Sequence, residues 1–407
     1  MKKNGKKNKN KLQEKAKNEN KSFLQNKTPR LEENINLGND SNKKPKTINI
    51  NIFQETIKND KNSKEIKMED NFSDPDNIKS IKKLTKNIDA IFDIDNTFDV
   101  FKSMEDILFL IYTNNFNSII LYNLIDCKIM SEIKNAHKKS IGNLKYYLEN
   151  DSDSDNNREL IMSVSAEDSD IKLWNIINLE CIFNYNLFYN DGFLFAACIL
   201  NDNNINYIIT SHFSIDCFPK NIKIYNLKEK YIKPIDNSDN NTVTIISFYD
   251  NKLCTNFIVA GNFGYIKSYD FTKNEIYYKY YDDEYNYSYH NSIVINNNKE
   301  LIQMIESSDK GIIRIWDFHS GMLLNKINIY DGKLYGICLW NNENIFVGNE
   351  KGTISLINLN EELEIKNINS HKSKVLSIKK INHPKYGECL LSESCNCIKL
   401  WKIKNKR

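Results

Sequence analysis

The chain has 407 residues, of which 40% are hydrophobic and 11% aromatic, so it can bury a sizeable core, and its many Tyr and Phe residues favour β-structure. A formal net charge of +3 is close to balance, which argues against the whole molecule being a polyanion binder. The N-terminus has no apolar stretch of the kind a secretory signal needs, and no run approaches the length of a membrane span. We therefore expect a cytoplasmic or nuclear protein that is not secreted.

Residues 1–78 form a Lys- and Asn-rich segment with few apolar residues and no sustained periodicity. Its first thirty residues contain eleven Lys or Arg against two acids, Glu14 and Glu19, whereas acids slightly predominate in residues 31–78. Such a segment cannot bury enough apolar surface to offset the entropy lost on ordering. We predict a disordered tail over 1–78, basic in 1–30, followed by a folded domain over 79–407.

One hexapeptide recurs seven times in the folded part, at intervals of 41–52 residues. The copies begin at Ile119, Ile171, Ile222, Ile266, Ile313, Ile354 and Ile398. Their fourth residues are aromatic in six copies and aliphatic in one: Tyr122, Trp174, Tyr225, Tyr269, Trp316, Ile357 and Trp401. The alternation within each copy is that of a β-strand with one face wetter than the other.

Further apolar runs flank each hexapeptide, such as LIMSVS from Leu160 before one copy and MLLNKINI from Met322 after another. Four strands in each repeat predict an all-β fold, a seven-bladed β-propeller of four-stranded antiparallel blades. The sequence continues only to the third strand of the last blade, so residues 79–86 are expected to supply its fourth strand and pair the two ends of the propeller.

These repeats resemble those of the WD-repeat family over residues 79–407. Trp316-Asp317 matches that family's closing dipeptide, and Ala136-His137 and Ser370-His371 retain the histidine of its Gly-His start. The resemblance implies structural roles for His371 and Trp401, and a buried hydrogen-bond network of His137, Asp168 and Trp174 in blade two. Because Ala166 stands where the family has serine, we expect that network to be incomplete.

The histidines lie in different repeats without metal-ligand spacing, and no nucleophile elbow, phosphate-cradling loop or HExxH helix is present. His383, Cys389, Cys395 and Cys397 could be interpreted as a metal cluster, but strand alternation explains their spacing. We therefore expect no catalytic residues, no metal site and no cofactor.

A tyrosine-rich segment between blades four and five is the leading candidate for partner binding. Its first half should be an outer strand and its second half a top-face loop, where large amphipathic side chains would meet an acidic rim. Ordinary packing of tyrosines in a Tyr-rich chain explains the segment equally well. A longer loop in blade three, which begins at His212, is a further candidate. The candidate contact residues are therefore Tyr285, Tyr287, Tyr289, Asp282, Asp283, Glu284, His212 and Asp309.

The resemblance implies a non-catalytic interaction scaffold or adaptor that docks a peptide or protein on the propeller top face within a larger complex. The alternative is a factor in RNA processing or ribosome assembly that uses the basic tail to bind nucleic acid. The tail also fits a nuclear localisation signal or a solvated segment without function. A membrane-lipid effector is less favoured. The resemblance implies that phosphoinositide-binding propellers of this architecture carry a paired-arginine motif within a blade, and no Arg-Arg pair occurs in this sequence.

Overall fold

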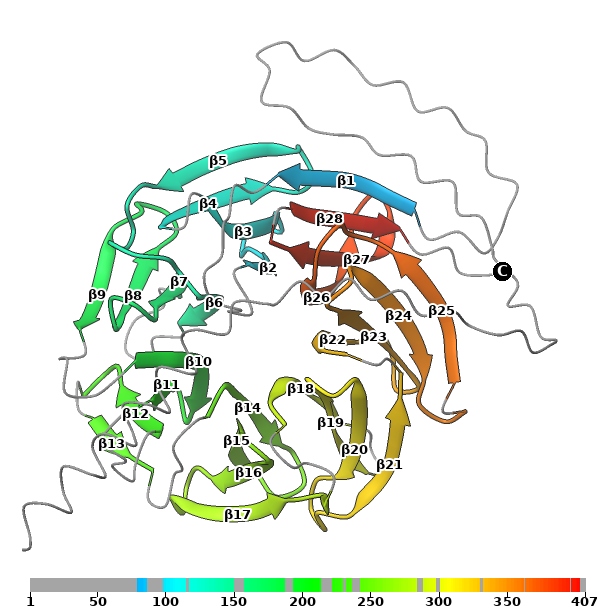
Figure 1. The fold of residues 1–407 in the computed structure, drawn as a ribbon. Coiled ribbons are helices and arrows are strands. Elements are labelled where there is room, and N and C mark those ends of the chain that lie inside the picture. The colour runs from blue at the N-terminus through cyan, green and yellow to red at the C-terminus, as the bar shows by residue number, and fades with distance from the viewer. Residues whose placement is uncertain are drawn as a thin grey trace, which may run out of the picture. The chain divides into compact units, whose positions relative to one another are not determined.

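A computed structural model describes residues 79–85, 98–114, 117–149, 157–186, 193–213, 222–229, 232–235, 242–283, 288–297, 301–329, 332–361, 363–395 and 397–402. Within these ranges 28 strands form seven four-stranded antiparallel sheets that follow one another around a ring (Figure 1), and no helix occurs in them. The predicted all-β, seven-bladed propeller is thus confirmed. The predicted disordered tail, residues 1–78, lies outside the described residues.

Each of the first six blades is built from four consecutive strands. Their bounds are β2 Phe98–Lys102, β3 Leu108–Asn114, β4 Ser118–Asn123 and β5 Lys128–Ile133 in blade one; β6 Asn143–Glu149, β7 Arg158–Ser165, β8 Asp170–Asn175 and β9 Cys181–Asn186 in blade two; β10 Phe193–Asp202, β11 Ile205–Phe213, β12 Ile222–Asn226 and β13 Ile232–Pro234 in blade three. The next three blades comprise β14 Thr244–Asp250, β15 Thr255–Asn262, β16 Tyr265–Asp270 and β17 Glu275–Tyr280; β18 His290–Asn297, β19 Ile302–Ser308, β20 Ile312–Asp317 and β21 Leu323–Asn328; β22 Leu334–Leu339, β23 Asn344–Asn349, β24 Thr353–Asn358 and β25 Leu363–Asn369.

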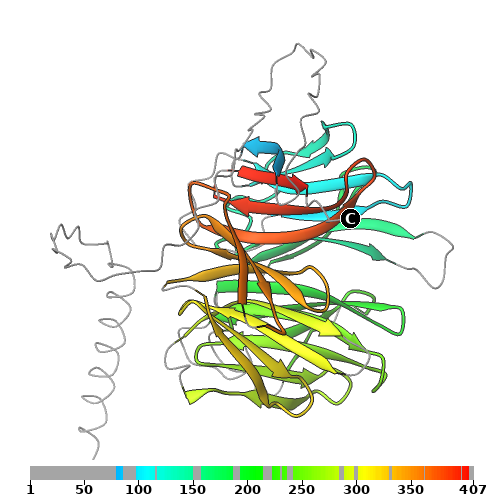
Figure 2. The same cartoon turned by 90° about the vertical axis from the view of Figure 1, so that its right-hand side faces the viewer.

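The first strand of each blade lies next to the central axis and the fourth lies at the perimeter (Figure 1). Seen from the side, the strands run across the ring from one face to the other (Figure 2). The hexapeptides form the third strands of the blades. Their side chains alternate between the two faces of the sheet and so enter the spaces between adjacent blades.

The hydrophobic core is divided into seven clusters, and each cluster joins two neighbouring blades, including blades seven and one. The fourth residue of every hexapeptide belongs to the cluster shared with the preceding blade and is at most 8% exposed. A large side chain at this position fills the wedge between two sheets that diverge outward. This explains why Trp, Tyr or Ile recurs there.

Blade seven contains β26 Val375–His383, β27 Gly387–Ser394 and β28 Cys397–Lys402, and its outer strand is β1, Lys79–Thr85. β1 pairs antiparallel with β28, from Lys79 opposite Lys402 to Thr85 opposite Cys397. The backbone groups of β28 are therefore bonded on both sides, and the ring is closed by strands from opposite ends of the propeller.

Candidate partner-binding face

One face of the ring carries two kinds of connection. In an antiparallel blade the second and fourth strands run in the same direction, so the turn from second to third strand and the connection to the next blade lie at the same end. We call this end the top face. A hydrogen bond of 2.7 Å from the backbone N–H of Lys139, in a connection between blades, to Asp168, in a second-to-third turn, joins the two kinds of loop in blade two.

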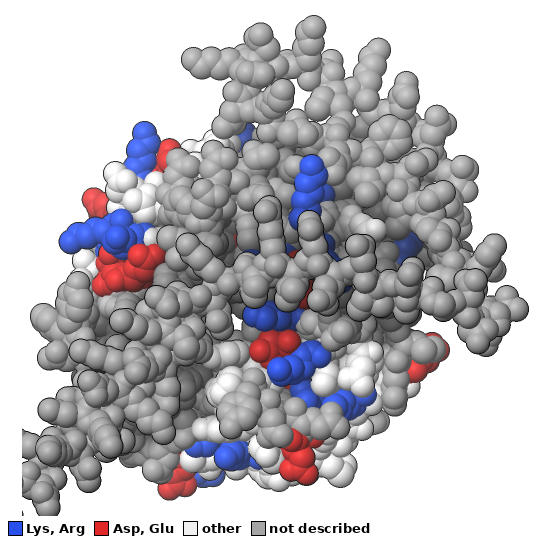
Figure 3. Space-filling model, in the orientation of Figure 1, with Lys and Arg blue, Asp and Glu red and all other residues white. Residues whose placement is uncertain are grey.

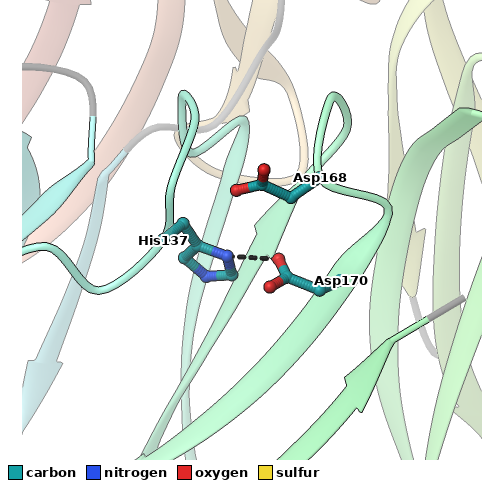
Figure 4. Close-up of side chains that lie close together, drawn as sticks. All are labelled: His137, Asp168 and Asp170. Carbon is teal, nitrogen blue, oxygen red and sulfur yellow. Dashed lines mark hydrogen bonds and ion pairs between the residues drawn. The ribbon is translucent and has the colours of Figure 1, made fainter.

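Beneath the top face of blade two lies a buried chain of hydrogen bonds. The Trp174 indole N–H donates to Ser163 Oγ at 2.8 Å, and the Ser163 hydroxyl lies 2.6 Å from His137 Nε2. The other ring nitrogen, His137 Nδ1, contacts the Asp170 carboxylate (Figure 4). All four polar groups are thereby satisfied, so the connection that carries His137 is fixed to two strands of the blade.

This network differs from the sequence-based expectation in two members. His137 and Trp174 take part as expected, but the carboxylate is Asp170 rather than Asp168, and Ser163 supplies the hydroxyl expected at position 166. The network is therefore complete, and the prediction that it is incomplete was wrong. Asp168 instead accepts the Lys139 amide at the surface (Figure 4), because residues 166–169 form the turn that follows β7.

Blade seven repeats the same arrangement with one substitution. Trp401 Nε1 donates to Ser392 Oγ at 2.8 Å, and Ser392 lies 2.6 Å from His371 Nε2. Opposite His371 Nδ1, at 3.3 Å, is the Sγ atom of Cys397, which stands at the position of Asp170. In each blade a lysine two residues before the tryptophan also donates to the backbone carbonyl that precedes the histidine, Lys172 to Ala136 and Lys399 to Ser370.

Among the described residues, one group of at least three potential metal ligands comes together, namely His137, Asp168 and Asp170. Both nitrogens of His137 are already engaged, with Asp170 and with Ser163. A metal ion would have to displace one of these contacts, so the geometry explains the group as a structural network.

Blade five contains a buried ionic network that was not predicted from the sequence. Arg314 and Glu306, both 0% exposed, are paired through Arg314 Nη1 and Glu306 Oε1 at 3.2 Å. Arg314 Nε also donates to Asp282 at 2.7 Å, and Lys326 Nζ lies 3.3 Å from the same carboxylate. His290 Nδ1 contacts the second Glu306 oxygen at 3.0 Å. A charged residue in the strand pattern IRIWDF was the only sequence signal for this network.

These contacts anchor both described ends of the connection between blades four and five. At its start, Asp282 is held by Arg314 and Lys326. At its end, Asp309 accepts the Ser288 hydroxyl at 2.9 Å and the Tyr289 amide at 3.1 Å. The Tyr289 ring packs on Phe263, with 4.6 Å between ring centroids, and burial raises the pKa of its hydroxyl.

The candidate contact residues divide into three groups. Asp283 is exposed, and Tyr289 and Asp309 are half-buried, whereas Glu284, Tyr285 and Tyr287 lie outside the described residues. Asp282 does not form an exposed rim, because its side chain is 13% exposed and ion-paired internally. His212 is 1% exposed and lies 2.7 Å from Thr210 Oγ1, so it is a buried strand residue rather than a contact residue.

The closing dipeptide of blade five is structural, as its position indicates. Trp316 is 1% exposed and meets Tyr280 edge to face at a centroid distance of 5.9 Å. Burial acts to raise the pKa of Asp317, but hydrogen bonds from the Ser320 hydroxyl and the amides of His319 and Ser320 outweigh it and hold that pKa below its usual value. The carboxylate thus fixes the turn between β20 and β21.

Charged side chains of both signs lie among the described residues of the face drawn in Figure 3, near the centre of the ring and along its rim. No helix within the described ranges is long and apolar enough to cross a membrane.

These features define the class of the protein as a closed seven-bladed β-propeller. No protein-family model matches the chain, and no curated protein matches it. Among solved structures, the chain is similar to Raptor of Chaetomium thermophilum, with a TM-score of 0.61 and 15% sequence identity. The match covers 81% of this chain but 29% of the Raptor chain, and at this identity it shows a shared fold.

Proposed function

We propose that the protein is a non-catalytic interaction scaffold that docks a peptide or protein partner on the top face of its propeller. One observation carries the proposal: the connection between blades four and five is anchored at both described ends, by Asp282 and by Ser288 and Tyr289. Anchoring of this kind lowers the entropy lost when a loop binds a partner. Exposed Tyr281 and Asp283, next to the first anchor, offer contact area and charge.

The surroundings of three buried histidines support a non-catalytic role for these residues. His137, His290 and His371 are buried and bonded to Asp170, Glu306 and Cys397. The contacts of His137 and His371 hold loops on strands, and that of His290 joins β18 to β19. A general acid or base needs access to a substrate proton. In these three residues the imidazole acts as a structural bridge.

Affinity purification of the intact chain tests the scaffold function. The comparison is between the wild type, the variant Y285A/Y287A/Y289A in the anchored connection, and Y249A. Tyr249 is 47% exposed and lies near the end of β14, at the opposite face, so Y249A controls for the loss of an exposed tyrosine away from the top face. We expect protein partners that are retained by the wild type and Y249A and lost from the triple variant. Partners that all three proteins retain equally would contradict docking at this loop.

A further inference from the structure

Lysine side chains gather on the top face of blades six and seven. Three adjacent loops contribute Lys333, Lys351, Lys372 and Lys374, which we call the lysine patch. The first three are exposed and Lys374 is half-buried. In sequence the three loops contain these four lysines and two acids, Asp331 and Glu350, so they carry a formal net charge of +2 in a chain whose net charge is only +3.

Backbone contacts hold the three loops together. The Glu350 N–H donates to the Lys333 carbonyl at 3.1 Å, which joins the turn after β23 to the connection before β22. On the other side of the same turn, the Gly352 carbonyl accepts the amides of Ser370 and His371 at 3.0 and 2.9 Å. The lysines are therefore presented by one fixed surface rather than by three independent loops.

Gly352 permits this close approach. Its φ is +86°, and a Cβ there would lie 2.3 Å from the His371 carbonyl oxygen. Only glycine fits both the conformation and the space. The His371 that meets this turn is itself held by Ser392 in the blade-seven network, so the patch rests on a buried hydrogen-bond chain.

The rest of the top face is more evenly charged. In blade two, Lys139 donates its backbone amide to Asp168, and Ser140 donates to Glu167, so carboxylates stand beside Lys138 and Lys139. Around blade five, Asp282 is matched by Arg314 and Lys326. The lysine patch is thus a local excess of positive charge, of the kind that steers a negatively charged partner.

We propose that the lysine patch binds an acidic peptide segment of a partner protein, an inference that rests on the proposed scaffold function. Single-stranded nucleic acid fits less well, because base stacking needs exposed aromatic rings and Tyr335 beside the patch is only 5% exposed. The large hydrophobic residues that are exposed in the described chain lie outside these loops, so the patch offers a bilayer no apolar anchor.

Lys374 adds a feature specific to anion binding. Its Nζ lies 5.8 Å from the centroid of the Tyr335 ring, and burial lowers its pKa. A carboxylate placed beside it would offset that desolvation and stabilise the ammonium form. The patch therefore combines exposed lysines, which attract the peptide, with a half-buried one whose charge an acidic ligand stabilises.

The test measures binding of a fluorescein-labelled oligo-glutamate peptide to the full-length chain by fluorescence anisotropy. The variant K333Q/K351Q/K372Q is compared with K102Q/K128Q/K273Q, which removes the same charge from lysines 60%, 59% and 69% exposed elsewhere. All three proteins keep the basic tail, so binding to the tail is common to them and a difference between the two triple variants arises from the propeller. We expect the patch variant to bind about tenfold more weakly than the wild type, roughly twofold for each exposed ion pair lost, and the control variant much less so.

Equal weakening in the two triple variants would overturn the inference. Stronger patch-dependent binding of oligo-uridine, or of phosphatidylserine vesicles, than of the glutamate peptide would also overturn it, in favour of a nucleic acid or a membrane. The affinity purification separates the two proposals. Top-face partners that survive K333Q/K351Q/K372Q unchanged refute the acidic-peptide inference alone, whereas the absence of any top-face partner refutes the scaffold function.

Discussion

Cys397 faces His371 in blade seven at the position where Asp170 faces His137 in blade two, with Sγ 3.3 Å from Nδ1. The two networks are otherwise matched, since each contains one serine, one tryptophan and one lysine in equivalent places. The chain therefore contains an internal comparison between a carboxylate and a thiol in the same environment.

Truncation to Ala should lower the free energy of unfolding by different amounts at Asp170 and at Cys397. Asp170→Ala removes a charged acceptor from the buried imidazole and should lower the free energy of unfolding by about 3 kcal/mol. Cys397→Ala removes a weak acceptor and should cost about 1 kcal/mol. Urea unfolding of the full chain measures both. Equal losses would mean that the carboxylate contributes no more than the thiol.

Removing Arg314 should be among the most damaging single changes in the protein. Arg314→Met leaves Glu306 buried without its cation and deprives Asp282 of one of two partners. Breaking a buried ion pair in this way should cost about 3–5 kcal/mol. Arg158→Met is the control, because Arg158 is 48% exposed and its pair with Glu149 should contribute less than about 1 kcal/mol. Thermal or urea unfolding of the two variants should therefore separate clearly.

Asp99 links blade one to the inner strands of blades seven and two, through Lys379 and the Tyr146 amide. Burial alone would raise the pKa of Asp99, but Lys379, Lys145 and these hydrogen bonds outweigh it and lower that pKa. A lowered folded-state pKa contributes stability that is fully present above the unfolded value of about 3.9 and is lost as pH falls through the folded value.

Asp99→Asn should therefore cost about 3 kcal/mol at neutral pH, because it also removes the carboxylate that is ion-paired with the buried Lys379 ammonium. The difference from the wild type should shrink as pH falls below the unfolded value of about 3.9 and through the lowered folded-state value, because Asp99 then becomes protonated in the wild type. Urea unfolding across this range provides the test. A difference that does not vary with pH would contradict the assigned direction of the Asp99 shift.

Gly321 and Gly264 offer a matched pair of left-handed glycines. A Cβ at Gly321, φ +67°, would lie 1.6 Å from the Tyr278 ring, whereas one at Gly264, φ +85°, would meet nothing within 4 Å. Gly264→Ala should cost about 1 kcal/mol from backbone strain alone. Gly321→Ala should cost about 1–3 kcal/mol more, because the Tyr278 ring must move. If steric overlap is the cause, Gly321→Ala in a Tyr278→Ala background should cost no more than Gly264→Ala.

The repeat pattern predicted the architecture because each hexapeptide encodes its own environment. Alternation places Trp174 and its counterparts between two blades, and seven such wedges require a closed ring. The pattern could not supply the register across a hairpin. β7 ends at Ser165, and the turn takes up Ala166–Ser169, where Ser169 has a φ of 51°. When the length of that turn is unknown, counting along the repeat assigns the carboxylate of the network to Asp168 instead of Asp170. It likewise assigns the hydroxyl to position 166 instead of Ser163.

The blade-five network lay beyond sequence reasoning for a different reason. Arg314 meets Glu306 across one hairpin, but it meets Asp282 from the preceding connection, 32 residues away. A single sequence gives no sign of which acid a buried arginine will reach. The signal that was present, an arginine flanked by isoleucines in a strand, predicts a buried partner without identifying it.

The pairing of β1 with β28 also determines when this propeller can be completed during synthesis. Lys79 pairs with Lys402, so the two strands are 323 positions apart, 402 minus 79. A ribosome makes β1 before any blade and β28 after six of them, and β1 has no strand partner for all of that interval. Contacts of such long sequence separation form late and slow folding, so the nascent chain exposes an edge that chaperones would need to protect.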